Sequence, residues 1–233
     1  MILSAGVGSR LKPLTNNKPK ALVEVNGKPM LGLVIEKLSG IGFNEIIINV
    51  HHHARQIIDY IKKNNDFYID IAISDESEKL LDTGGGIMKA AWFFDKNPFL
   101  VHNVDVISNM DIHDLFRAHV ESEDLVTLAV RNRESKRKLI FDEDLLLTGR
   151  EDDEKQEKIL LKALKKENYY AFSGIHVIDP LIFQKIKKTG AFSIIDAYLE
   201  ICHQEKIRAY IDDQSYWYDL GTIEKIKKAE KML

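Results

Sequence analysis

The chain has 233 residues, 45% hydrophobic and 30% charged, a composition that can build a sizeable buried core. Its formal net charge of −3 offers no global positive field for nucleic acid, and its single cysteine, Cys202, excludes a disulfide framework and a cysteine-rich zinc site. No segment approaches the ~18 consecutive apolar residues of a membrane span, and the N-terminus lacks a signal-peptide leader. We therefore expect a cytoplasmic protein with neither nucleic acid nor membrane as a partner.

Strand-like and helix-like patterns alternate through the first 130 residues. The apolar residues 1–3 predict a short strand that enters the loop from Ser4 to Arg10, and the β-branched run at residues 45–50 predicts a buried parallel strand. Helices are expected at residues 29–38, 54–63, 86–94 and 111–121, and further strands at residues 68–74, 98–106 and 125–130. The alternation predicts an α/β fold: a doubly wound, mostly parallel sheet flanked by helices, with sites at the carboxyl ends of strands.

The alternation of strand-like and helix-like patterns stops between residues 131 and 168. Charge-rich stretches flank a strand–turn–strand pattern at residues 139–147, which predicts a small β-rich elaboration of the same sheet. The basic run from Arg131 to Lys138 could touch an anionic substrate, but charge runs are usually solvated, and we interpret this one as a solvated face. Strands are then expected at residues 169–178 and 207–211, and helices at residues 180–188, 193–204 and 223–232. Without a linker or repeat, we expect one domain over residues 1–233.

Small residues and two cations near the N-terminus predict a phosphate-binding loop. Gly8 lets the backbone approach a phosphate closely, and Arg10 supplies a forked cation suited to phosphate oxygens. Pro13 argues against the helix of a dinucleotide fingerprint, and the Gly-Lys-Ser/Thr of a Walker loop is absent. Lys20 follows shortly afterwards, where an ammonium can neutralise charge that develops in phosphoryl transfer.

Three consecutive glycines follow Asp82 and Thr83. Such a run costs conformational entropy on folding, so it is most easily explained where a flat ring or a phosphate must approach the main chain. A plain mobile loop is the alternative, and the helical pattern beginning at Gly86 makes it less favoured. We therefore expect a ligand-contacting loop at residues 83–86.

Two aspartates far apart in the chain are candidate metal ligands. Asp105 ends an apolar strand pattern, and Asp219 follows an aromatic one. Mg²⁺ favours one or two carboxylates together with substrate phosphates, so the pair predicts a shared Mg²⁺ site. A turn or helix-cap role is an equally good reading of either aspartate alone. The adjacent histidines at positions 51–53 project in different directions, which favours a substrate contact or a polar strand end over a zinc site.

This combination resembles the signature of the sugar-phosphate nucleotidyltransferases, the glycosyltransferase-A-like pyrophosphorylases. Their pattern is Gly-x-Gly-x-Arg, then Pro-Leu-Thr, then Pro-Lys, and it matches residues 6–10, 13–15 and 19–20. Asp105 and Asp219 match the two metal aspartates of the family. The resemblance covers essentially the whole chain. The Asp-Thr-Gly-Gly-Gly segment is most similar to short N-acetylmuramate 1-phosphate uridylyltransferases, with mannose 1-phosphate guanylyltransferases as near neighbours.

The resemblance implies an activity and a division of the chain. It implies a Rossmann-like mixed sheet and transfer of a nucleoside monophosphate from a nucleoside triphosphate to a sugar 1-phosphate, with Mg²⁺ as cofactor. UTP with N-acetylmuramate 1-phosphate or a similar hexose 1-phosphate is the first expectation, and GTP with mannose 1-phosphate the next. It implies a nucleotide-binding part at residues 1–130, a sugar-binding elaboration with return strands at 131–222 and a terminal helix at 223–233. A monomer or small homo-oligomer is expected.

The resemblance also implies residue roles. Catalytic roles are implied for Arg10, Lys20 and Asp105, and metal binding for Asp105 and Asp219. Sugar-phosphate contacts are implied for Asn103, Ser173 and Gly174. Nucleotide contacts are implied for a larger set: Ala5, Gly6, Gly8, Ser9, Arg10, Thr83, Gly84 and Gly85. Three features depart from the family pattern. Val104 replaces the usual glycine before the metal aspartate, Ile223 replaces the proline that often follows Gly-Thr, and no Glu-Lys-Pro segment is evident.

Two other functions remain open from the sequence. A cytidylyltransferase for a phosphorylated alcohol such as phosphocholine would need an aromatic cage around the choline cation. Tyr169, Tyr170, Trp217 and Tyr218 could be taken for one, and we interpret them as core packing. A catalytically silent regulatory subunit is the second alternative, and the intact cationic and acidic residues argue against it.

Overall fold

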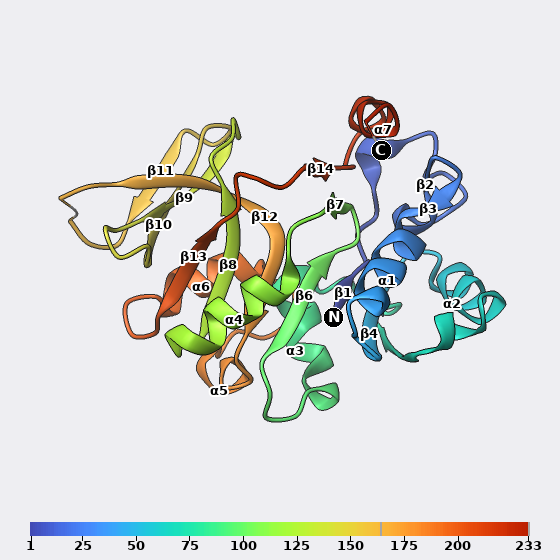
Figure 1. The fold of residues 1–233 in the computed structure, drawn as a ribbon, viewed down its shortest axis with the longest axis horizontal. Coiled ribbons are helices and arrows are strands. Elements are labelled where there is room, and N and C mark those ends of the chain that lie inside the picture. The colour runs from blue at the N-terminus through green and yellow to red at the C-terminus, as the bar shows by residue number, and fades with distance from the viewer. Residues whose placement is uncertain (164, 233) are drawn as a thin grey trace. The chain divides into compact units, whose positions relative to one another are not determined.

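The computed structural model describes residues 1–163 and 165–232, which pack as two compact units (Figure 1). Unit 1 comprises Met1–Phe93, His102–Ser108 and Trp217–Leu233, and unit 2 comprises Phe94–Val101 and Asn109–Tyr216. The chain therefore enters unit 2 twice and returns to unit 1 each time.

Unit 1 is built on parallel strands in the order β6-β1-β4-β5. The strands are β1 (Ile2–Leu3), β4 (Glu45–Val50), β5 (Asp70–Asp75) and the last two residues of β6 (Phe99–Asn103). Ile2 pairs with both Ile48 and His102, so the short β1 is a central strand. The β-branched run at residues 46–48 is at most 2% exposed, as expected of a parallel strand covered on both faces.

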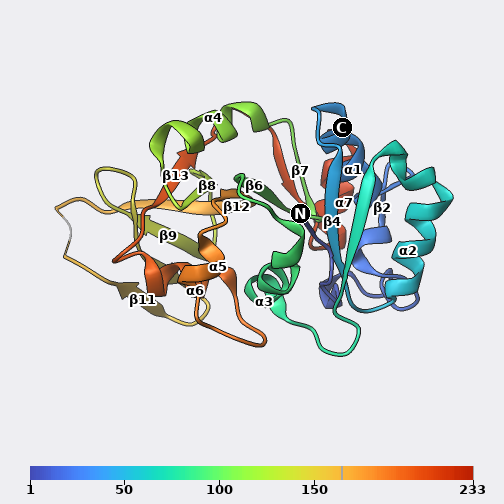
Figure 2. The ribbon, with the colours of Figure 1, turned by 90° about the horizontal axis from the view of Figure 1, so that it is seen from below.

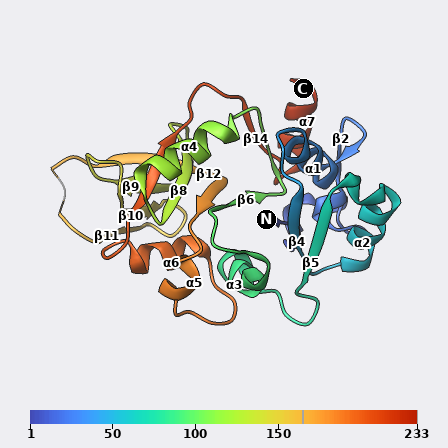
Figure 3. The same ribbon diagram turned by 60° about the horizontal axis from the view of Figure 1, so that its bottom comes forward.

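Helices cover both faces of the unit 1 sheet. They are α1 (Met30–Gly40), α2 (Ala54–Lys63) and α3 (Asp82–Lys89). The helix α7 (Ile223–Glu230) packs on short strands outside this sheet. Single turns are formed by η1 (Ser9–Leu11), η2 (Lys20–Leu22), η3 (Asn65–Tyr68) and η4 (Ala90–Phe93). Figures 2 and 3 show α2 and α3 on opposite sides of β4 and β5. Right-handed crossover connections place the two helices on opposite faces, because they run in opposite directions along the sheet. Helix α2 connects β4 to its outer neighbour β5, whereas α3 connects β5 back to β6 on the other side of β1. The predicted α/β fold with a parallel sheet is confirmed.

Two short antiparallel pairs complete unit 1. One joins β2 (Glu24–Val25) to β3 (Lys28–Pro29), and the other joins β7 (Val106–Ser108) to β14 (Trp217–Asp219). The second pair brings the end of the chain back beside residues that directly follow β6.

Unit 2 contains a mixed sheet. Its strands are β8 (Val126–Arg131), β9 (Arg137–Phe141), β10 (Leu147–Asp152), β11 (Glu157–Leu160), β12 (Asn168–Ile178) and β13 (Ile207–Ile211). The long β12 pairs antiparallel with β8 and β9, whereas β13 pairs parallel with β8. Figures 2 and 3 show α4 (Ile112–Ser122) on one side of β8 and β12, and α5 (Ile182–Lys185) and α6 (Ile194–Ile201) on the other.

Several elements differ from their predicted bounds. The strand expected at residues 98–106 is interrupted, because Val104 and Asp105 form a turn between β6 and β7. The helix expected at residues 180–188 is one turn long, since Ile186 adopts extended backbone and buries its side chain. The strand–turn–strand expected at residues 139–147 extends at both ends and gains a third strand, β11. No helix of residues 1–163 and 165–232 is long and apolar enough to cross a membrane.

His102 gives unit 1 a pH-dependent stability. Its side chain lies at the carboxyl end of β6 and is 1% exposed. Burial, reinforced by the Lys37 ammonium, lowers the pKa of the imidazole to about 3. A histidine of the unfolded chain titrates near ~6.5, so between these values the unfolded state binds more protons than the folded state. Stability is therefore lost as pH falls below ~6.5.

We predict that His102→Leu flattens this dependence. The free energy of unfolding of the wild type should fall by about 1.4 kcal/mol more per pH unit than that of the variant between about pH 6 and pH 4. Urea unfolding across this range measures the difference. His52→Gln, which changes an exposed ring, should keep the wild-type slope. Equal slopes for His102→Leu and the wild type would contradict the prediction.

Candidate functional site

The predicted phosphate loop directly follows β1 and packs on Lys20. Gly8 has a φ of 68°, in the left-handed region that favours glycine. A Cβ at Gly8 would lie 2.9 Å from the Lys20 Cβ and 3.1 Å from the Thr15 Cγ2. The Thr15 hydroxyl also donates to the Gly8 carbonyl at 2.9 Å. The loop is thus fixed against the lysine, while Ser9 and Arg10 remain exposed.

Lys20 forms an ion pair with Asp105. The Lys20 ammonium donates to the Asp105 Oδ2, and the two side chains are 15% and 17% exposed. Asp105 occupies the turn between β6 and β7, beyond the carboxyl end of a parallel strand. The cation and the carboxylate predicted from separate motifs are therefore in contact.

Asp219 is held beside Asp105 by strand pairing. In the β7–β14 pair Asp219 lies opposite Val106, and the Leu220 amide donates to the Asp105 carbonyl at 2.8 Å. The Asp219 carboxylate accepts from the Gly221 amide at 2.8 Å and from the Lys225 ammonium. Burial would raise the pKa of Asp219, but these two donors hold it below its ordinary value. Asp219 is therefore ionised at neutral pH.

Arg10 completes this group of side chains. A Cβ at Gly221 would lie 2.8 Å from the Arg10 Nη2 and 2.8 Å from the Asp219 Oδ1, so the guanidinium reaches the same small space as the carboxylate. Arg10, Lys20, Asp105 and Asp219, predicted from four parts of the sequence, all belong to unit 1 and lie together there.

The donor set suits a divalent cation that also binds substrate phosphates. Each of the two carboxylates already accepts a lysine ammonium, so both positions are electrostatically suited to a cation. Among residues 1–163 and 165–232, no three acidic, histidine or cysteine side chains form a complete protein-only cage. Mg²⁺ typically takes one or two carboxylates and fills its other positions with water and phosphate, which fits this arrangement.

A buried polar chain, missed by the sequence analysis, connects the phosphate loop to α3. The Ser4 amide donates to the Asn49 Oδ1 at 2.6 Å, and the Asn49 amide group donates to the Glu76 Oε1 at 2.7 Å. The other Glu76 oxygen accepts from the Leu81 amide at 3.0 Å. All three polar side chains are at most 2% exposed. The signal in the sequence was Asn49, a polar residue within an otherwise β-branched strand.

The three glycines lie within a helix, so the loop expected at residues 83–86 is wrong. Helix α3 begins at Asp82, and its first turns contain Gly84, Gly85 and Gly86, all buried. A Cβ at Gly86 would lie 2.7 Å from the Glu76 Oε1 and 2.9 Å from the Asn49 Nδ2. At least this glycine is therefore explained by close packing on the buried polar chain.

The residues predicted to contact nucleotide and sugar divide between the units. Ala5, Gly6 and Thr83 lie in unit 1, on the loop and on α3, and Asn103 is the last residue of β6 in the same unit. Ser173 and Gly174 lie in unit 2, both buried on β12, where Gly174 has a φ of 76° and the pairing with β8 shifts register. Their roles stay predictions.

The histidine run and the aromatic residues have local structural roles. The His51 Nδ1 lies 2.7 Å from the Glu76 carbonyl oxygen, and His53 occupies a left-handed position before α2. In unit 2 the Tyr169 hydroxyl donates to Glu167, and the Tyr170 ring packs on that of Phe141 at 6.1 Å. These two tyrosines therefore have partners other than a cationic ligand.

A parallel α/β sheet with a tight glycine turn, two cations and two carboxylates at its carboxyl edge is the arrangement of an enzyme that transfers phosphoryl-type groups. The chain belongs to the nucleotidyl transferase family, whose model matches residues 1–233. It is an enzyme of the nucleotidyltransferase type. Members of the family generally depend on a divalent metal ion.

Individual relatives place the chain within this family. It is 28% identical to an N-acetylmuramate alpha-1-phosphate uridylyltransferase of Neisseria meningitidis, over all of this chain and 96% of the relative. It is 26% identical to a mannose-1-phosphate guanyltransferase of Yarrowia lipolytica, over 95% of this chain and 60% of that relative. The fold matches HddC of Yersinia pseudotuberculosis, solved with GMP-PN, with a TM-score of 0.80 at 23% identity over 99% and 97% of the chains.

We predict that Gly8→Ala destabilises the protein. The left-handed backbone alone costs a non-glycine residue about 1–2 kcal/mol, and the contact with Lys20 adds to this. Urea unfolding gives the loss. Gly6→Ala in the same loop is the control, because a Cβ there meets no atom within 4 Å. Equal stabilities for the two variants would contradict the steric explanation.

Glu76→Gln should break the buried polar chain. The amide nitrogen that replaces one carboxylate oxygen would face the Asn49 or Leu81 donor, leaving a buried group unsatisfied at a cost of about 1–3 kcal/mol. Thermal or urea unfolding measures the loss. The matched change Glu78→Gln, at an exposed position, should leave stability unaltered. The buried chain would not be stabilising if both variants behaved alike.

Proposed function

We propose that this protein joins a nucleoside triphosphate to a sugar 1-phosphate, forming a nucleoside diphosphate sugar and pyrophosphate. The observation that carries the proposal is the convergence of Arg10, Lys20, Asp105 and Asp219 beside the Gly8 turn. Two cations suit the phosphates, and two carboxylates suit a divalent cation that neutralises them. The named relatives, a uridylyltransferase and a guanyltransferase of sugar 1-phosphates, support the same reaction.

UTP with N-acetylmuramate 1-phosphate is the first substrate pair to test. Its support is the uridylyltransferase relative, which this chain matches over 96% of the relative's length. GTP with mannose 1-phosphate comes second, because the chain spans about 60% of the guanyltransferase relative.

Asp105 and Asp219 are the residues that would hold Mg²⁺. When bound, the ion would neutralise phosphate charge and help to align the reacting phosphates. The lowered pKa of Asp219 keeps its carboxylate ionised for this role at neutral pH. When substrate binds, Lys20 and Lys225 would leave Asp105 and Asp219 and bind phosphate oxygens, and the two carboxylates would bind the metal ion instead.

The rest of the chemistry requires positioning more than proton transfer. An oxygen of the sugar phosphate attacks the α-phosphorus in line, a P–O bond forms, and the bond to the β-phosphate oxygen breaks, so that pyrophosphate leaves with the electron pair. A phosphate dianion is already a nucleophile, and no general base is required. The amides of Gly8 and Ser9, the Arg10 guanidinium and the Lys20 ammonium would hold the triphosphate and stabilise the charge on the leaving group. Thr83 on α3 and Ser173 on β12 are proposed contacts to nucleotide and sugar.

The test is a screen of the four common nucleoside triphosphates against a panel of sugar 1-phosphates, with Mg²⁺, following pyrophosphate release. One productive pair is expected, and Asp105→Asn should lower its turnover by about 10²-fold or more while the protein stays folded. Asp95→Asn, at an exposed position of unit 2, is the charge-matched control. Failure of every pair would favour the silent regulatory subunit, and full activity of Asp105→Asn would remove this aspartate from the site.

A further inference from the structure

Unit 2 contains a pocket with a concentration of positive charge. The pocket lies between the β9–β10 hairpin and the start of α6, and its volume is about 440 Å³. Five of its lining side chains are cationic: Arg133, Arg137, Lys138, Arg150 and Lys155. Three are acidic: Glu151, Asp152 and Asp196. The lining residues therefore carry two more positive than negative charges, and two further carboxylates, Glu154 and Glu157, pair with Arg137 and Arg150 from outside the lining.

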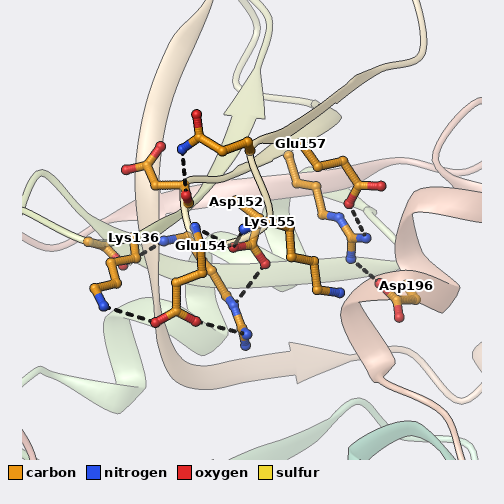
Figure 4. Close-up of polar contacts among 11 residues, drawn as sticks. Lys136, Asp152, Glu154, Lys155, Glu157 and Asp196 are labelled. Carbon is orange, nitrogen blue, oxygen red and sulfur yellow. Dashed lines mark hydrogen bonds and ion pairs between the residues drawn. The ribbon is translucent and has the colours of Figure 1, made fainter.

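Two of the arginines are fixed by carboxylates. Arg150 bridges Glu157, at 3.0 Å, and Asp196 on α6, and its side chain is 22% exposed. Arg137 donates to the buried Asp152 at 3.0 Å. Figure 4 shows these two clusters within one region of the unit. An arginine held in this way keeps several N–H donors in a fixed fork, which is the geometry that recognises carboxylates and phosphates.

The two pocket lysines hold their ammonium groups outside these ion-pair clusters, and Lys138 lies opposite Glu151 in the β9–β10 pairing. Within residues 1–163 and 165–232, neither Lys138 nor Lys155 forms an ion pair. Lys155, labelled in Figure 4, extends beside the arginine clusters without a dashed contact at its ammonium. The Arg150 Nε is also buried, with no acceptor in the described part of the chain. An anion in the pocket would therefore meet both lysine ammonium groups and guanidinium N–H donors.

The basic run is thus more than the solvated face expected from the sequence. Arg131, at its start, is 9% exposed and donates to the Ser215 carbonyl at 2.6 Å, and Arg133 donates to the Phe172 carbonyl at 3.2 Å. Phe172 also lines the pocket and precedes Ser173, the proposed sugar contact. The pocket therefore borders the segment of β12 that is proposed to bind the sugar.

We propose that this pocket binds the anionic group, a carboxylate or a phosphate, of a small molecule. The group has two possible sources. One is an acidic substituent on the sugar 1-phosphate itself, such as the lactyl carboxylate of N-acetylmuramate 1-phosphate, and this form rests on the proposed function. The other is a separate anionic metabolite that binds without the nucleotide.

The first experiment uses inorganic phosphate as the probe on the full chain, with neither nucleotide nor sugar present. Amide shifts in ¹H–¹⁵N spectra at Ser135 and Ser193 report the pocket, and shifts at Ser9 report the phosphate loop separately. Phosphate should shift the pocket amides, and the paired change Lys138→Gln with Lys155→Gln should weaken that binding by about tenfold. Lys136→Gln, an exposed lysine of the same hairpin that does not line the pocket, should leave it unaltered.

The second experiment identifies the source. It compares kcat/KM for N-acetylmuramate 1-phosphate and N-acetylglucosamine 1-phosphate, which differ by the 3-O-lactyl group that carries the carboxylate. The double lysine variant should lower the preference for N-acetylmuramate 1-phosphate, expressed as its kcat/KM divided by that of N-acetylglucosamine 1-phosphate, by about tenfold. If turnover of the sugar without the lactyl group is retained, this fall assigns the pocket to the substrate. Phosphate binding with an unchanged ratio assigns it to a separate anion.

The proposal is overturned if phosphate leaves the Ser135 and Ser193 amides unshifted, or shifts them equally in the wild type and the double variant. This result is independent of turnover. If no sugar 1-phosphate releases pyrophosphate, the proposed function fails while the phosphate titration still decides the pocket.

Discussion

The pairing of three residues of β7 with three of β14 is the constraint on which the site depends. It places Asp219 opposite Val106, and the main-chain bond from Leu220 to Asp105 fixes the two aspartates at neighbouring positions. Two carboxylates held close together repel each other unless cations intervene. Lys20 and Lys225 supply these cations here, one to each carboxylate. Because the two carboxylates require a neighbouring positive charge, the pair is also suited to a divalent cation.

A second constraint keeps the phosphate loop in register with α3. The Ser4–Asn49–Glu76 chain runs from the residue after β1, across β4, to the residue after β5, and three hydrogen bonds link it through to Leu81. Buried polar groups are costly when unpaired, so the loop and the helix tolerate little independent movement. Small residues at both ends, Gly8 and Gly86, allow the close approach on which this coupling depends.

The sequence predicted those elements whose structure is determined by interactions between residues close together in the chain. Strand 45–50 and helix 54–63 were predicted to the residue, because their apolar patterns are strong and their ends are marked. The start of α3 was wrong because glycine propensity argued for a loop, whereas tertiary packing on Glu76 holds the segment helical. The pairing of β14 with β7 was missed, since three-residue strands carry almost no periodicity. Arg10, Lys20, Asp105 and Asp219 were singled out from their motifs and matched by the resemblance, and they are found together. The nucleotide and sugar contacts stay predictions, because they depend on ligands.

The route of the chain through unit 1 has a consequence for synthesis on the ribosome. The sheet, the glycine turn, Lys20 and Asp105 are all encoded within the first 108 residues of the sequence. The second carboxylate and the strand that carries it are translated only after the whole of unit 2. A nascent polypeptide would therefore hold half of the acidic pair until unit 2 has been translated, so premature termination anywhere in unit 2 would yield a product without the second carboxylate.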